Sequence, residues 1–190
     1  MLPKILVIPG SLRVGSNNVR LAALAAKELT LAEAEVTRIS LEDYPLPLFD
    51  GSAPVNPPAV AIQLKHMVMA HQGVFIASPE YTASIAPLLK NAIDWLSRLR
   101  ERGEDTHAAF KGRIFAIASA SRAADGGLRG LIALRQILEL GCGALVIPEQ
   151  LAVPQADEAF DDMDNLKDEK LAADLKALAR RLVDLASVIA

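Results

Sequence analysis

KILVIPGSLRVGSNN (residues 4–18) joins an apolar run directly to a cluster of small polar residues. The run KILVI (4–8) is short and rich in branched apolar residues, which is typical of a strand buried on both faces. The residues that follow, VRLAALAAKEL (19–29), carry apolar side chains at helical spacing and predict a helix over residues 18–31. A polar loop between a buried strand and a helix start is a common place to hold an anion.

The rest of the chain continues the alternation of strands and helices. Further strands are predicted at residues 34–40, 73–78, 112–119 and 144–148, and further helices after Pro58 and at 86–99, 127–140 and 167–189. A Pro-rich loop over residues 41–58 separates the second strand from the second helix. This alternation predicts a single α/β domain over residues 1–190, with a doubly wound, five-stranded parallel sheet in the order 2-1-3-4-5. The loops after the first, third and fourth strands should then converge, because ligands of such sheets bind beyond the carboxyl ends of the strands.

Composition excludes several classes of protein. The net charge of −3 and an aromatic content of 4% argue against a nucleic-acid partner. No apolar run approaches the ~20 residues of a membrane span, and, because the first strand is predicted to begin at residue 4, we expect no secretion signal. The single cysteine, Cys142, excludes an internal disulfide, so a cytoplasmic location is expected. His66, His71 and His107 lack the spacing of a zinc site, and we expect the first two to be exposed.

The first loop has the residues of a phosphate site. Its polar side chains are Ser11, Arg13, Ser16, Asn17 and Asn18. The serines offer hydroxyl donors, Arg13 offers a fixed charge with a forked donor set, and Asn18 is expected to cap the following helix. The spacing is not that of a dinucleotide or nucleoside triphosphate loop, so a monophosphate fits best. The alternative is an ordinary helix cap with one solvated arginine.

The second and third loops could border a flat ligand. SPEYT (78–82) follows the third strand, and Pro79 makes its start rigid. Tyr81 offers a flat apolar face, although packing at the rim of the sheet would explain it equally well. Ser119 and Ser121, after the fourth strand, are small enough to let a planar group approach.

Three segments resemble the NADPH-dependent FMN reductase family, which has the flavodoxin-like three-layer fold and includes quinone, chromate and azo-dye reductases. They are GSLRVGSNN (10–18), SPEYTASIAPLLKNAIDWLSR (78–98) and GGLRGLIALRQIL (126–138). The resemblance covers nearly the whole chain. It implies that the FMN phosphate is held by Ser11, Arg13, Ser16, Asn17 and Asn18. It also implies that Pro79, Glu80, Tyr81 and Thr82 border the isoalloxazine ring, with Ser119 near the ribityl chain or ring.

This resemblance implies an oxidoreductase in which FMN carries the redox chemistry, so no catalytic acid, base or metal is assigned. NAD(P)H would reduce the flavin, and a quinone, chromate, azo dye or similar small molecule would accept the electrons. Two alternatives remain open, a flavin reductase that releases reduced FMN to a partner enzyme and a flavodoxin-type electron carrier. A phospho-receiver module is disfavoured, because no acidic cluster follows the first strand.

Helix 86–99 suggests self-association. Its apolar stripe, which includes Leu88, Ala92, Trp95 and Leu99, is wider than one sheet face requires. We therefore expect a homodimer or homotetramer, unless the second helix and the chain after Leu99 cover the stripe within one subunit. Cys142 is expected to be a small buried filler, and the acidic run DEAFDDMD (157–164) a solvated loop.

Overall fold

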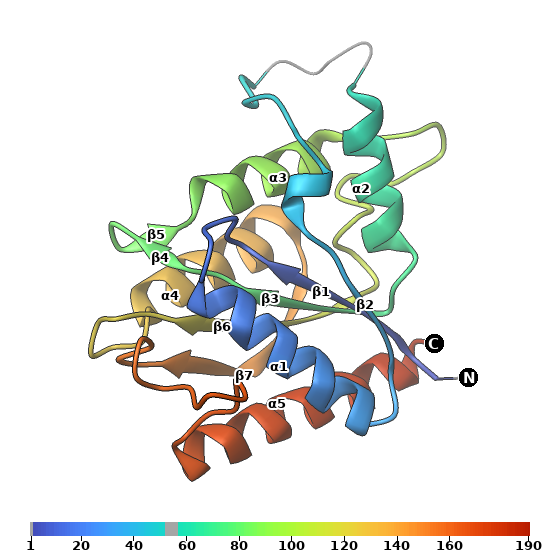
Figure 1. Ribbon diagram of the computed structural model, residues 1–190. Helices are drawn as coiled ribbons and strands as arrows, with labels where there is room; N and C mark the ends of the chain where they lie inside the picture. Colours follow the sequence, from blue (N-terminus) through green and yellow to red (C-terminus); the bar gives the residue numbers. More distant parts are fainter. Residues whose placement is uncertain (1, 52–56) are drawn as a thin grey trace.

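A computed structural model describes residues 2–51 and 57–190 of the chain. The middle of the molecule is a parallel sheet of five strands in the order β2-β1-β3-β6-β7 (Figure 1). These strands are β1 (Lys4–Pro9), β2 (Glu35–Arg38), β3 (Gly73–Ala77), β6 (Ile114–Ala120) and β7 (Leu145–Val153). The order confirms the predicted 2-1-3-4-5 sheet. Residues 52–56 of the predicted Pro-rich loop lie outside the described residues.

Helices cover both faces of the sheet and complete three layers (Figure 1). Helices α1 (Asn17–Leu31) and α5 (Glu169–Val188) pack on one face, and α2 (Ala59–Met69), α3 (Pro87–Arg98) and α4 (Leu128–Gln136) pack on the other. The alternation of β1 shows why: Ile5 and Val7 enter the core under α1 and α5, and Leu6 enters the core on the opposite side. All three are fully buried, so the continuous apolar run reflects burial on both faces.

Three short elements were not expected from the sequence. The antiparallel hairpin of β4 (Glu80–Tyr81) and β5 (Ser84–Ile85) follows β3, and the 3-10 turn η1 (Leu41–Asp43) follows β2. A π-helical turn, η2 (Ile137–Gly141), continues α4. Each spans at most six residues, too few to leave a periodic pattern in the sequence.

The last strand is longer than predicted. β7 continues past Pro148 to Val153, and its register with β6 shifts between Phe115 and Ile117. Proline cannot donate a hydrogen bond to the sheet, so the strand bulges at Pro148 and resumes pairing at Gln150. This extension carries the carboxyl end of β7 alongside the end of β6, where Ala120 pairs with Val153.

The apolar stripe of α3 is covered within the chain, so it does not support self-association. Trp95 is 6% exposed and packs with Ala61 of α2 and with Phe49, whose ring meets it edge to face at 5.3 Å. The indole Nε1 donates to the carbonyl oxygen of Pro47 at 2.7 Å. Helix α2 and the segment around residues 46–49 therefore occupy the face that a second subunit was expected to fill.

One prediction about the histidines is wrong. His71, expected to be exposed, is only 6% exposed, and its Nδ1 lies 2.7 Å from the carbonyl oxygen of Met67. Burial lowers the pKa of His71, which favours the neutral ring. Cys142 is buried as expected, and burial raises the pKa of its thiol to about 11, as suits an unreactive filler. Among the described residues, no helix is both long and apolar enough to cross a membrane.

Candidate functional site

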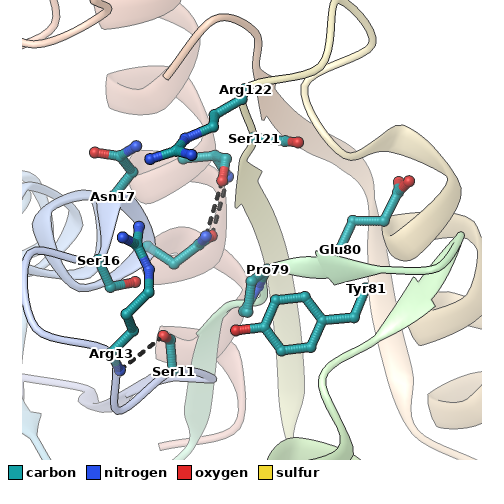
Figure 2. A pocket seen from close by; sticks show the side chains of 11 residues that line it. Ser11, Arg13, Ser16, Asn17, Pro79, Glu80, Tyr81, Ser121 and Arg122 are labelled. Carbon is teal, nitrogen blue, oxygen red and sulfur yellow. Dashed lines mark hydrogen bonds between the residues drawn. The ribbon is translucent and has the colours of Figure 1, made fainter. Parts of the chain in front are cut away.

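The loops after β1, β3 and β6 converge at the carboxyl edge of the sheet, as the fold predicts, and border an open cavity of about 270 Å³ (Figure 2). Its walls come from three separate parts of the chain. The lining residues are Ser11, Arg13, Ser16, Asn17, Asn18, Pro79, Glu80, Tyr81, Ala120, Ser121 and Arg122.

The start of α1 forms one wall of the cavity. Ser16 is the N-cap residue of this helix, yet its side chain makes no capping hydrogen bond. The N–H groups of the first turn of a helix have no partner within the helix, so those of Asn17 and Asn18 are left to face a ligand. Gly15, just before the cap, has a φ of +68°, a conformation that other residues rarely adopt. This wall is suited to an anion.

Ser11 and Arg13 extend this wall. The backbone N–H of Arg13 donates to Oγ of the buried Ser11 at 3.2 Å, which leaves the serine hydroxyl hydrogen free to point at a ligand. The Arg13 side chain is exposed, and within the described part of the chain it makes no hydrogen bond or ion pair. An unpaired guanidinium beside a free helix start is the charge arrangement that a phosphate requires.

Asn18 does not cap α1, which corrects the prediction. Its Nδ2 donates to the carbonyl oxygen of Ala120 at 2.8 Å, and its Oδ1 accepts from the N–H of the same residue at 3.0 Å. The side chain thus replaces a strand partner at the end of β6 and ties the first loop to the third. The cap position belongs instead to Ser16, two residues earlier.

Gly10, just after β1, packs closely against the start of the loop after β3. A Cβ atom on Gly10 would lie 3.3 Å from both Pro79 Cδ and Leu89 Cδ2, so these neighbours would have to shift slightly to admit a side chain. Pro79 then leads into the hairpin β4–β5. Tyr81 is 47% exposed, and its ring extends toward the side of the cavity where Ser11 and Arg13 lie (Figure 2).

Glu80 contributes its backbone to the cavity wall, and its carboxylate points away (Figure 2). One carboxylate oxygen accepts from the N–H of Gly130 at 2.9 Å, and the other pairs with Arg129 at 2.7 Å. The side chain is 6% exposed, so this pair fixes the hairpin against the start of α4. Sequence reasoning placed Glu80 at the site but missed its positioning partner.

Two predicted site residues do not line the cavity. Thr82 sits in the turn of the hairpin and is exposed. Ser119 is fully buried, and its Oγ has no hydrogen-bond partner in the described structure. It lies under Gly127, where an added Cβ would come within 2.2 Å of that oxygen. Ser121 and Arg122, further along the same loop, reach the cavity instead.

Sequence reasoning also missed a second cavity. It has a volume of about 490 Å³, lies beside the first loop and shares Ser11, Arg13 and Ser16 with the first cavity. Arg38 at the end of β2 lines only this second space. Among the described residues, no group of three or more His, Cys, Asp or Glu side chains is arranged to hold a metal ion.

A doubly wound sheet with a serine–arginine cradle at its switch point is the architecture of a flavodoxin-like, mononucleotide-binding protein. The comparisons with known proteins agree. Residues 3–158 match the model of the NADPH-dependent FMN reductase family, so the chain belongs to that family.

Two relatives from bacteria are similar in sequence. An NAD(P)H-dependent FMN reductase of Pseudomonas aeruginosa is 36% identical over 168 residues, covering 88% of this chain and 86% of the relative. A quinone reductase of Escherichia coli is 36% identical over 136 residues, covering 71% of this chain and 69% of the relative. In structure, the flavoenzyme NAD(P)H:(acceptor) oxidoreductase of Paracoccus denitrificans superposes with a TM-score of 0.81 at 26% identity, covering 98% of each chain.

Membership makes the chain an oxidoreductase with FMN as cofactor and NAD(P)H as co-substrate. The residues present fit FMN. The cavity combines free helix-start N–H groups, a serine hydroxyl and an unpaired guanidinium, the donors that a phosphate monoester needs. On the opposite side, Pro79 and the ring of Tyr81 provide apolar surface for a flat ring.

Proposed function

We propose that the protein oxidises NAD(P)H and passes the electrons to a small-molecule acceptor, of which quinones are the first class to test and chromate and azo dyes the next. The observation that carries the proposal is the convergence of a phosphate cradle and an apolar wall in one cavity. Bound FMN supplies the two-electron chemistry. The 36% identity to an FMN reductase and to a quinone reductase supports the reaction class.

In this proposal the chain's own residues bind and orient. Ser11, Arg13 and the first-turn N–H groups of Asn17 and Asn18 hold the phosphate, because they supply donors and positive charge at one end of the cavity. Backbone atoms of residues 79–81 border the ring, and the Glu80 pairs with α4 hold that backbone in place. Ser119 and Thr82 act through the shape of their loops, since neither lines the cavity.

The proposal is tested with the purified protein, two flavins, two nicotinamide nucleotides and one quinone. FMN and riboflavin are titrated while flavin fluorescence is followed, and NADH and NADPH oxidation is then measured with a benzoquinone. We expect FMN to bind much more tightly than riboflavin, and acceptor-dependent oxidation to give parallel double-reciprocal plots because both substrates use one open face. Equal flavin affinities would contradict the phosphate site, and absence of oxidation would contradict the reductase.

A flavodoxin-type electron carrier is the weaker alternative. Carriers of that type usually have aromatic side chains on both sides of the flavin, whereas Tyr81 is the only aromatic residue lining the cavity within the described residues. An open ring face suits an enzyme, because a nicotinamide or a quinone must stack there. The second alternative is a flavin reductase that releases reduced FMN to a partner enzyme. Gel filtration tests this alternative, since such an enzyme would lose its flavin on the column.

A further inference from the structure

Arg122 lies at the rim of the cavity, on the loop that leaves β6. Its Nε forms an ion pair with Oδ2 of Asp157 at 2.6 Å, and Asn17 Nδ2 donates to Oδ1 of the same carboxylate at 2.9 Å. Asp157 therefore joins the third loop to the start of α1. This anchor holds an exposed arginine, whose side chain is 72% accessible, at the cavity beside the start of α1.

The anchor leaves most of the guanidinium available. Arginine has five N–H donors in a planar fork, and the ion pair with Asp157 uses only the Nε edge. The two terminal nitrogens make no hydrogen bond within the described residues, so they can donate to another group. Figure 2 shows the guanidinium groups of Arg13 and Arg122 on the side of the cavity where Asn17 lies, and Tyr81 on the other side.

The charges around the cavity favour a dianion. Glu80 is already neutralised by Arg129, which does not line the cavity. This leaves two cations, Arg13 and Arg122, and one anion, Asp157, beside the free start of α1. A phosphate monoester with two arginines on different loops gains two charge-assisted contacts, each stronger than a neutral hydrogen bond.

We propose that Arg122 is a second phosphate ligand, which acts together with Arg13 from a different loop, and that Asp157 is its positioning residue. This role rests on the proposed FMN site. Arg122 lies in the loop after β6 and is not part of the phosphate motif in the first loop. The proposed role also explains why the third loop is tied to α1 twice, through Asn18 to Ala120 and through Asn17 and Asp157 to Arg122.

A simpler role for Arg122 must be distinguished from this one. Asp157 places a negative charge near the phosphate site, and Arg122 could act only by neutralising it. Removing Arg122 would weaken phosphate binding in either case. The two roles differ once Asp157 is replaced by asparagine. Arg122 then has no negative charge to neutralise, so a further loss of FMN affinity on removing Arg122 reports a direct contact to the phosphate.

The experiment is a double-mutant cycle on the full-length protein, with the dissociation constants of FMN and riboflavin measured by fluorescence titration. The variants are Arg122→Ala, Asp157→Asn and Arg122→Ala/Asp157→Asn. We expect Arg122→Ala to weaken FMN binding at least tenfold and riboflavin binding less than twofold. The double variant should remain at least fivefold weaker for FMN than Asp157→Asn alone.

Three outcomes would overturn the inference. The first is an unchanged FMN constant in Arg122→Ala, and the second is an equal loss of affinity for riboflavin. The third is a double variant that matches Asp157→Asn, which would leave only the neutralising role. Arg122→Lys serves as the conservative variant and should recover part of the FMN affinity. Far-ultraviolet circular dichroism checks that each variant folds. If wild-type protein binds no FMN, the proposed function fails, a result distinct from any difference among variants.

Discussion

Arg13 extends from the loop between β1 and α1 without a partner in the described structure, so its removal should affect ligand binding and leave the fold intact. We expect Arg13→Ala to weaken FMN binding by about 1.5–3 kcal/mol, the scale of a hydrogen bond to a charged group. Fluorescence titration measures this. Arg38→Ala is the matched control, because Arg38 lines only the neighbouring cavity and should leave the FMN constant unchanged. Equal losses in both variants would indicate a general electrostatic effect.

Asn18 is a residue whose removal should affect stability before it affects binding. Its two hydrogen bonds satisfy both backbone groups of Ala120, which lie buried at the end of β6. Asn18→Ala leaves these groups unpaired and should lower the free energy of unfolding by about 2 kcal/mol. Urea denaturation without ligand measures the loss. Asn17→Ala, which removes one bond to the half-exposed Asp157, should cost less than about 1 kcal/mol.

The hairpin β4–β5 turns through two residues in an unfavourable conformation. Thr82 and Ala83 have φ values of +49° and +59°, which fits the two-residue hairpin turns that favour Asn and Gly. We expect Thr82→Asn to raise the free energy of unfolding by about 0.5–1 kcal/mol, because a branched side chain is strained there. Thr82→Val keeps the branched side chain and should not raise the free energy of unfolding. Thermal melts measure both variants. A gain from valine would show that backbone strain is not the cause.

Helix α2 is tied to the turn after α3 by a buried lysine. Lys65 is fully buried, and its Nζ donates to Glu101 at 2.8 Å and also to Glu104. Burial alone would lower the pKa of Lys65, but the two carboxylates outweigh it and raise the pKa. The hydrogen bond from Lys65 is the largest cause that lowers the pKa of both glutamates.

This cluster predicts a loss of stability in acid. A carboxylate whose pKa is lowered in the folded state stabilises above its ordinary pKa of 4.5, and the contribution disappears as the pH falls below it. Lys65→Met should therefore make the unfolding free energy fall less steeply below about pH 4.5, as measured by denaturant titrations from pH 6 to pH 3. Lys90→Met, which removes an exposed pair with Asp94, should leave the steepness unchanged. An identical slope in Lys65→Met would contradict the role of the cluster.

At the scale of the whole molecule, we propose that the protein is a homodimer or homotetramer. The support no longer comes from α3, whose stripe is covered by α2 and by residues 46–49. It comes from α4, where Leu128 and Ile132 are 41% and 58% exposed beside the hairpin β4–β5. Light scattering at micromolar concentration should give a multiple of the chain mass, and Ile132→Glu should shift it toward the monomer. Leu31→Glu, at the far end of α1, is the control that should not.

Most of the fold could be predicted because hydrophobic periodicity is local. The runs at residues 4–8 and 73–78 identified buried strands, and the alternation with helices identified the sheet order. The errors occurred where one residue overrides the pattern. β7 bulges at Pro148 and then continues to Val153, beyond the predicted end of the strand. His71 is buried, although exposure was predicted.

The sequence by itself determined the layers, the strand order and the three loops that meet at the cavity, because each follows from residue types and spacing along one segment. Only the tertiary structure decided where individual side chains point. The side chain of Asn18 bonds to Ala120, that of Glu80 bonds to the start of α4, and that of Arg122 pairs with Asp157. Each of these bonds links segments far apart in the chain. A donor and an acceptor of this kind meet only after the core has packed, so no local pattern records them.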